Sequence, residues 1–178
     1  MRVVAGQLGG RRLAAPRGRD TRPTADRVRE AVFSILGPLD GERVLDLFAG
    51  SGALGIEALS RGAGSAVFVD DATSAVRAVR ENLDALGLSA RVVRADAAQA
   101  LRDAREAGDA YDLIFVDPPY RHAERWAGRL SELLPAVLAS GGRVVSESDR
   151  RAPLALGLRL ADERRYGDTL IRIHAHDS

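Results

Sequence analysis

The chain has 178 residues, which corresponds to one domain of ordinary size and is enough to bury a core. It contains no cysteine, so disulfides, zinc-thiolate sites and thiol nucleophiles are excluded. No apolar run approaches the roughly 20 residues that a membrane helix needs, and the basic N-terminus lacks the apolar core of a signal peptide. We therefore expect a cytoplasmic protein with no membrane partner and no metal.

The net charge of +1 conceals an uneven distribution along the chain. Residues 1–30 contain eight arginines and three acids, a net of 8 − 3 = +5, whereas residues 31–178 contain 18 arginines and 22 acids, a net of 18 − 22 = −4. A basic end of this kind suits a polyanion such as a nucleic acid. A solvated basic arm without a partner is the alternative that charge alone leaves open.

The first elements of the chain form a short N-terminal extension. Residues 2–5 and 11–13 flank a glycine-rich connection, which predicts a small β-hairpin, and residues 16–23 read as an irregular linker. Thr24 is placed to cap a helix over residues 24–36, whose apolar positions recur at helical spacing. We therefore divide the chain into a basic hairpin with its linker, residues 1–23, and a main domain, residues 24–178.

From residue 43 onward, apolar runs of strand length alternate with helical segments. We expect strands at 43–48, 65–70, 90–95, 111–117 and 142–147, and helices at 53–61, 73–86, 97–107 and 123–138. Two further strand-like runs, 156–162 and 169–175, are joined by residues 163–168 without a helix and indicate an antiparallel edge hairpin. The pattern predicts an α/β, Rossmann-like fold with a mostly parallel seven-stranded sheet and helices on both faces.

A glycine-rich turn follows the strand expected at 43–48. Gly50, Gly52 and Gly55 fit the G-x-G-x-x-G spacing, in which the backbone turns sharply and approaches a ligand at a helix N-terminus. Asp46 lies within the preceding strand, and Asp70 ends the next strand, 20 residues beyond Gly50, where an acid can hold a ribose diol. This combination predicts an adenosine-containing cofactor but does not by itself say which one.

The second motif is Asp117-Pro118-Pro119-Tyr120, directly after the strand expected at 111–117. The two prolines impose an extended backbone without amide donors of its own. Because ligands of open α/β sheets bind at the carboxyl ends of the strands, this motif should face the glycine turn across a crevice. A rigid structural turn is the alternative for this motif taken alone.

With Asp96 after the third strand, these motifs resemble class I S-adenosylmethionine-dependent methyltransferases that modify exocyclic amines of nucleobases. The pattern Arg22-Pro-Thr-Ala-Asp-Arg-Val-Arg-Glu30, preceded by the hairpin, narrows the resemblance to the bacterial 16S ribosomal RNA guanine-N2 methyltransferase family, often called RsmD. The resemblance covers essentially the whole chain, although the Asp-Pro-Pro-Tyr motif is shared with adenine-N6 methyltransferases.

The resemblance implies a role for each motif. The methionine end of S-adenosylmethionine would be held by Asp46, Phe48, Ala49, Gly50, Ser51 and Gly52. Asp70, rather than its neighbour Asp71, would bind the ribose hydroxyls, and Asp96 and Ala97 would contact the adenine, with a helix N-cap as the structural alternative for Asp96. Asp117 and the Pro118 carbonyl would accept the two protons of the target amine, Pro119 would complete the rigid motif, and Tyr120 would stack on the flipped base.

The same resemblance implies 16S ribosomal RNA as the partner, as free RNA or within an assembling small ribosomal subunit, and a monomeric enzyme. The candidates for RNA contact lie in the basic N-terminal segment, where guanidinium groups match phosphate geometry. They are Arg2, Arg11, Arg12, Arg22, Thr24, Arg27 and Arg29, of which one or two arginines are expected to pair with Asp26 or Glu30 instead.

Three alternatives remain open at this point. The first is methylation of another nucleobase amine, such as adenine N6, which poses the same local chemical problem. The second is an NAD-dependent oxidoreductase, because the glycine spacing and Asp70 also satisfy that fingerprint. Asp46, the Pro-Pro motif and the lack of a further substrate domain count against it. The third is a non-catalytic RNA-binding module.

Overall fold

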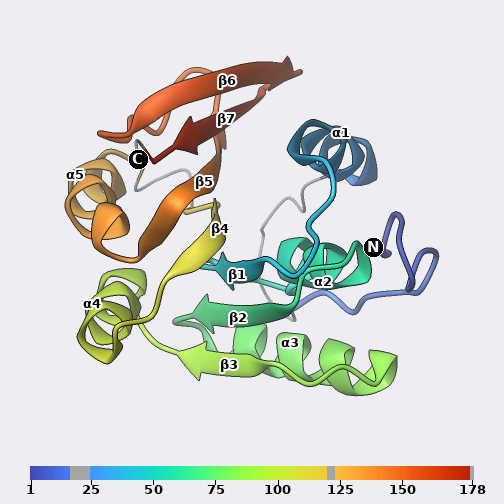
Figure 1. The fold of residues 1–178 in the computed structure, drawn as a ribbon. Coiled ribbons are helices and arrows are strands. Elements are labelled where there is room, and N and C mark those ends of the chain that lie inside the picture. Colours follow the sequence, from blue (N-terminus) through green and yellow to red (C-terminus); the bar gives the residue numbers. More distant parts are fainter. Residues whose placement is uncertain (17–24, 120–122, 177–178) are drawn as a thin grey trace.

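The computed structural model describes residues 1–16, 25–119 and 123–176 (Figure 1). The predicted helix 24–36 is present as α1, which the structure begins at Asp26. The described elements, in chain order, are α1 (Asp26–Leu36), β1 (Arg43–Asp46), α2 (Ala53–Ser60), β2 (Ser65–Asp70), α3 (Thr73–Leu86), β3 (Arg91–Arg94), α4 (Ala97–Ala107), β4 (Tyr111–Val116), α5 (Ala123–Leu133), the 3₁₀ turn η2 (Leu134–Ala136), β5 (Leu138–Asp149), β6 (Arg159–Tyr166) and β7 (Thr169–Ala175).

The strands form one seven-stranded sheet in the order β3-β2-β1-β4-β5-β7-β6. Strands β1 to β5 run parallel to one another, whereas β7 is antiparallel to both β5 and β6. The predicted fold class is therefore confirmed, including the antiparallel hairpin at the edge. The order reverses between β1 and β4, and such a switch point is where open α/β sheets bind ligands.

Helices cover both faces of the sheet, as the apolar strands require. Residues of α1, α2 and α3 pack with Phe68 and Phe115 in one core cluster. Residues of α4 and α5 pack with Leu45 and Ile114 in a second cluster on the other face. Figure 1 shows α4 and α5 on one side of the sheet and α1 with α2 on the other. Within the described ranges, no helix is long and apolar enough to cross a membrane.

Most element boundaries lie within about two residues of the prediction, and two regions differ by more. The strand expected at 156–162 is β6, Arg159–Tyr166, because Gly167 with φ 61° closes a two-residue turn to Thr169. The helix expected to reach residue 138 ends at Leu133 and passes through η2 into β5, which begins at Leu138. Gly141, with φ 70°, therefore lies inside β5, whereas the prediction had the strand begin one residue after it. Neither difference changes the topology.

The predicted N-terminal hairpin is a short antiparallel pair with an isolated bridge between Arg2 and Arg12. The Val3 amide donates to the Arg11 carbonyl at 2.9 Å, and the Leu13 amide donates to the Met1 carbonyl at 3.0 Å. Val3 and Leu13 are buried in the same core cluster as α1 and α2. Residues 1–16 are thus packed onto the main domain as part of its core.

Candidate active site

Four acidic side chains lie at the carboxyl ends of four strands on either side of the switch point. Asp46 ends β1, Asp70 ends β2, Asp117 follows β4, and Glu147 lies near the end of β5. Asp46, Asp70 and Glu147 are buried, and Asp117 is half-buried. The two motifs predicted from the sequence therefore meet at one edge of the sheet.

The glycine turn joins β1 to α2 as predicted. Gly50 and Gly52 have φ of 57° and 79°, in the left-handed region that glycine adopts without strain, and Gly52 is the N-cap of α2. The Gly52 amide donates to the Ala49 carbonyl at 2.7 Å. A Cβ on Gly55 would lie 2.4 Å from a ring carbon of Phe68, so this glycine allows α2 to pack closely on β2. Phe48, Ala49 and Ser51 complete the turn.

Asp46 is positioned beneath this turn by a hydrogen bond within the protein. The Gly55 amide donates to its Oδ2 at 3.0 Å, and the side chain is 2% exposed. Desolvation raises the pKa of Asp46 to about 7, against the effect of the Gly55 amide and with a further contribution from the Asp70 charge. A cationic group brought to this carboxylate would restore its ionised form.

Asp70 faces the turn from β2. Its Oδ2 accepts a hydrogen bond from the Gly50 amide at 3.0 Å and its Oδ1 from the Ala72 amide at 3.0 Å. The neighbouring Asp71 is exposed. The buried member of the pair is thus the one that contacts the glycine turn.

Asp96 is the N-cap of α4, where its Oδ1 accepts from the amides of Ala98 and Gln99 at 3.0 and 3.3 Å. The helix-capping alternative for Asp96 is therefore present. Asp96 is exposed at the end of β3, and Ala97 is buried beneath it. Both oxygens of a carboxylate can accept, so a capping role leaves acceptor capacity toward a ligand.

The second motif lies across from the turn. Asp117 is half-buried, Pro118 is buried and Pro119 is exposed, whereas Tyr120 lies outside the described residues. Burial raises the pKa of Asp117 well above its usual range, and the charges of Glu147 and Asp46 raise it further. A carboxyl with this bias holds a proton readily, which suits a group that must accept one.

A small pocket lies beside Asp117, with a volume of about 10 Å³, enough for a single water molecule. It is lined by Val32, Leu54, Val116, Asp117, Val145, Glu147 and Ile171. A larger cavity of about 310 Å³ lies at the start of β3, at the opposite end of that strand from Asp96. We place the chemistry at the smaller pocket because it borders the acid of the Asp-Pro-Pro motif.

Sequence reasoning missed Glu147. The register pairs Phe115 with Val145 and Val116 with Ser146, so the next position on each strand sets Glu147 beside Asp117, with backbones on the order of 5 Å apart. The available signal was an acid flanked by two serines shortly after the apolar pair Val144-Val145, which is a weaker form of the pattern that singled out Asp46 and Asp117.

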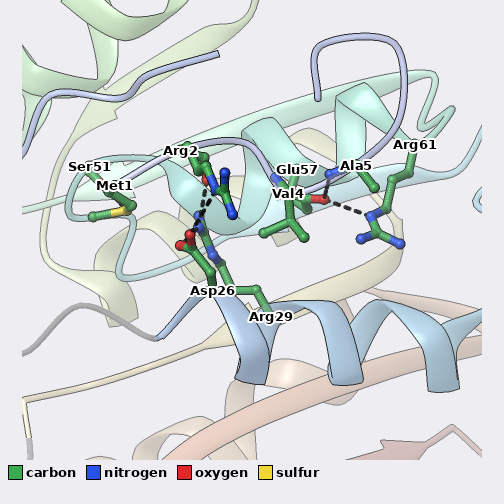
Figure 2. A network of polar contacts seen from close by, with 9 residues as sticks. All are labelled: Met1, Arg2, Val4, Ala5, Asp26, Arg29, Ser51, Glu57 and Arg61. Carbon is green, nitrogen blue, oxygen red and sulfur yellow. Dashed lines mark hydrogen bonds and ion pairs between the residues drawn. The ribbon is translucent and has the colours of Figure 1, made fainter. Parts of the chain in front are cut away.

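The N-terminal segment is held on α2 by buried polar side chains that the sequence did not single out (Figure 2). The carboxylate of Glu57 accepts from the amides of Val4 and Ala5 at 2.7 and 3.0 Å and forms an ion pair with Arg61. Ser60 Oγ donates to the Ala5 carbonyl at 2.6 Å and accepts from the Leu8 amide at 2.9 Å. The segment is thereby fixed beside the helix that follows the glycine turn.

Asn82 of α3 joins this segment to the turn itself. Its Nδ2 donates to the carbonyls of Ala14 and Ser51 at 3.0 and 2.9 Å, and its Oδ1 accepts from the Ala14 amide at 2.7 Å. These contacts span 31 to 68 residues of sequence. No local pattern could have revealed them.

The candidate RNA-binding arginines fall into three groups. Arg2, Arg11, Arg12 and Arg27 are exposed, although Arg2 contacts Asp26 and Arg11 donates to the Ala85 carbonyl. Arg22 and Thr24 lie outside the described residues. Arg29 is fully buried, with its Nη2 within 2.6 Å of both Asp26 and the Arg2 carbonyl (Figure 2), so its expected phosphate contact does not fit this placement.

No group of three or more metal-ligating side chains is present in the part of the chain that the structure describes.

Comparison with known proteins places the fold and the site in context. A Bacillus subtilis (strain 168) protein named "Putative rRNA methyltransferase YlbH" is 42% identical over 185 residues, covering 98% of each chain. Ribosomal RNA small subunit methyltransferase D of Escherichia coli (strain K12) is 42% identical over 123 residues, covering 68% of this chain and 61% of that protein. A solved structure named "Putative methyltransferase yhhF from Escherichia coli" superposes with a TM-score of 0.83 at 34% identity, covering 100% of this chain and 98% of the other.

The strand order, the antiparallel β7 and the glycine turn facing an Asp-Pro-Pro motif define a class I methyltransferase and exclude the oxidoreductase alternative. The sequence profile of the family described as "Conserved hypothetical protein 95" matches residues 1–175. The chain belongs to this family, and the resemblance to ribosomal RNA small subunit methyltransferase D is confirmed.

Proposed function

We propose that this chain transfers a methyl group from S-adenosylmethionine to the exocyclic N2 amine of a guanine in 16S ribosomal RNA. The single observation that carries this proposal is the meeting of Asp117 and Pro118 with the glycine turn at the switch point of a class I methyltransferase sheet. The names of the family relatives support ribosomal RNA as the substrate class.

The cofactor side of the crevice is assigned to groups that suit each part of S-adenosylmethionine. Asp46 and residues 48–52 would hold the methionine end, since its ammonium needs a carboxylate and its carboxylate needs donors. Asp70, whose carboxylate also accepts from the Gly50 and Ala72 amides, would accept from the ribose hydroxyls. Asp96 and Ala97 would border the adenine. When bound, the cofactor supplies an electrophilic methyl group on a sulfonium, which is a good leaving group.

The substrate side acts by orientation. The guanine N2 lone pair is delocalised into the ring, so the amine is a poor nucleophile until its protons are engaged. Asp117 and the Pro118 carbonyl would accept these two protons as hydrogen bonds and aim the lone pair at the methyl group. A carbon–nitrogen bond forms as the carbon–sulfur bond breaks, and the amine proton leaves to Asp117 or to water. Pro119 would hold the motif rigid, and Tyr120 would stack on the flipped base.

Residues 1–23 are proposed as the RNA-contacting extension of a methyltransferase domain formed by residues 24–178. Arg2, Arg11, Arg12 and Arg27 are exposed and available for phosphate contact, and Arg22 and Thr24 are included from the sequence pattern. We propose a monomer that acts in the cytoplasm, where the RNA is presented either free or in an assembling small ribosomal subunit.

Tritium transfer from labelled S-adenosylmethionine tests this proposal, with free 16S RNA and partly assembled subunits from a strain lacking the protein as substrates. The unaltered chain should label one or both. Asp117→Ala should lower transfer by roughly 100-fold or more, by analogy with the loss of a positioned transition-state group, yet bind S-adenosylhomocysteine normally. Normal transfer by this variant would remove Asp117 from the mechanism.

A further inference from the structure

Arg29 is the only fully buried arginine in the part of the chain that the structure describes. Its Nη2 donates to the Arg2 carbonyl and to Asp26 Oδ1, both at 2.6 Å. Its Nε and Nη1 are buried, and neither has a hydrogen-bond partner among the described residues. A buried guanidinium with unpaired donors is costly, because desolvation is offset only when the charge and the N–H groups are paired. The described part of the chain thus leaves two of its three nitrogens without an acceptor.

The position of Arg29 is set by α1 and by the first residues of the chain (Figure 2). Arg2, whose carbonyl accepts from Arg29, follows Met1, whose Sδ lies 3.5 Å from Ser51 Oγ in the glycine turn. Val32, one helical turn after Arg29 on α1, lines the pocket beside Asp117 together with Leu54. Arg29 therefore lies on the side of the crevice between the glycine turn and the Asp117 pocket.

The charges around the crevice show which ligand would satisfy Arg29. Asp46, Asp70, Asp117 and Glu147 are all acidic, which suits the ammonium and sulfonium of S-adenosylmethionine but repels its carboxylate. Arg29 is the buried cation on this side of the crevice, and its full burial separates it from the exposed arginines that are available to a phosphate backbone. A carboxylate accepts naturally from a guanidinium in such a setting.

We propose that Arg29 is a cofactor-binding residue that donates through Nη1 or Nε to the carboxylate of the methionine portion of S-adenosylmethionine. This assignment rests on the proposed function, because it takes the methionine end of the cofactor to be held by residues 48–52. Asp26, whose side chain is 41% exposed, forms an ion pair with Arg29 through Nη2 and so fixes the orientation of the guanidinium. The ion pair thus positions the donor and leaves Nη1 and Nε to the ligand.

Two ligands that differ only in the carboxylate test the proposal. S-adenosylhomocysteine carries the full amino-acid end, and its decarboxylated analogue keeps the amine and lacks the carboxylate. Binding of both is measured by calorimetry to the unaltered full chain, to Arg29→Met and to Arg29→Lys. Arg102→Met is the matched control, because Arg102 is an exposed arginine of α4 to which no contact with cofactor or RNA is assigned.

Arg29→Met should weaken S-adenosylhomocysteine binding roughly 10- to 100-fold, the usual cost of a charged hydrogen bond, and change binding of the decarboxylated analogue less than about threefold. Arg29→Lys should keep part of the affinity for S-adenosylhomocysteine. This variant also provides the test if Arg29→Met does not fold. Arg102→Met should leave both affinities as they are.

Other outcomes overturn the assignment. Equal weakening of both ligands would show that Arg29 acts only through the fold, and unchanged S-adenosylhomocysteine binding would show that it does not contact the carboxylate. Loss of RNA affinity alone would assign the anion to a phosphate. Failure of the unaltered chain to bind S-adenosylhomocysteine would overturn the proposed function first, and this assignment with it.

Discussion

At the residue scale, the site is a row of carboxyl groups on three adjacent strands. Each of these carboxyl groups lies two residues after a member of one core cluster. Val44 precedes Asp46, Phe115 precedes Asp117, and Val145 precedes Glu147 in this way. The three side chains therefore share the face that α1 and α2 cover. Burial raises the pKa of both Asp46 and Asp117, with a further contribution from the Asp70 charge for Asp46 and from the Glu147 and Asp46 charges for Asp117. A cationic cofactor and a donor-rich base would relieve this condition.

The charge of Glu147 should be visible in the pH dependence of methyl transfer. Only ionised Asp117 accepts both an amine hydrogen bond and the departing proton, so single-turnover rates should rise with pH as Asp117 ionises. Glu147→Gln removes a neighbouring negative charge that raises the pKa of Asp117, and the acid limb should move to lower pH. Asp149→Asn, two residues further along β5, is the control and should leave the limb in place. An unmoved limb in Glu147→Gln would separate Glu147 from Asp117.

Asp46 should make the cofactor-free protein less stable as pH rises. Its pKa of about 7 in the folded state lies above the ordinary value of 3.8, so its contribution to stability is complete below about pH 4 and is lost as pH rises to about 7. The loss is a few kcal/mol, because each unit is about 1.4 kcal/mol. Asp46→Asn should lack it and be the more stable protein at pH 8, although it binds cofactor less well. Urea denaturation at a series of pH values measures the free energy of unfolding of both proteins. If this free energy changed with pH in parallel for the two, the prediction would be contradicted.

At the element scale, the N-terminal segment and α2 form one unit. Glu57, Ser60 and Asn82 hold residues 4–14 through backbone contacts, and Gly6 makes the closest approach, since a Cβ there would lie 1.9 Å from the Ser60 carbonyl oxygen. The segment carries exposed arginines, whereas the helix carries the glycine turn. The proposed RNA contact and the proposed cofactor contact would thus depend on the same support.

Gly6→Ala should release the N-terminal segment from α2. Gly6 and Gly10 both have a positive φ, of 81° and 84°, so alanine strains the backbone equally at each position, but only at Gly6 does the Cβ meet another atom. Gly6→Ala should therefore lower RNA affinity on the order of 10-fold and expose residues 1–16 to protease, while Gly10→Ala changes either by less than about threefold. Similar behaviour of the two variants would show that docking of the segment does not matter for RNA binding.

Local periodicity was sufficient to predict most elements, including β2, α3, α4 and β7 with their observed bounds. It failed at β6, because this edge strand is largely exposed on both faces and its run of charged residues has no apolar alternation. The two motifs located the site because an acid after an apolar strand is a local signal. The position of Glu147 follows from the strand order, and that of Arg29 follows from the packing of α1. Neither can be read from a local sequence pattern.

At the scale of the whole molecule, basic and acidic residues are concentrated in different places. The first 30 residues carry a net +5, and the exposed arginines 2, 11 and 12 lie on the docked segment, while the strand ends hold the acids. The arrangement favours docking of a phosphate backbone beside a crevice that itself attracts cations and amine donors.

Reversal of Arg11 and Arg12 to Glu should weaken RNA binding and reduce its salt dependence, by about one unit of slope for each phosphate that the protein no longer neutralises. S-adenosylhomocysteine affinity should not change. The control is the double change of Arg102 and Arg105 to Glu. Both arginines are exposed on α4, so the change in net charge is the same but lies on the opposite face of the sheet. Filter binding across a salt series measures the slopes. If both double variants lost RNA affinity and salt dependence equally, the effect would come from net charge alone and not from Arg11 and Arg12.

The identity of the methylated nucleoside tests the central claim most directly. Mass spectrometry of nucleosides, after reaction of the unaltered chain with 16S RNA or partly assembled subunits, should show N2-methylguanosine, and the Asp117→Ala reaction should show none above background. Formation of N6-methyladenosine, or N2-methylguanosine at equal levels with both proteins, would contradict the claim that Asp117 and Pro118 present a guanine amine to the cofactor.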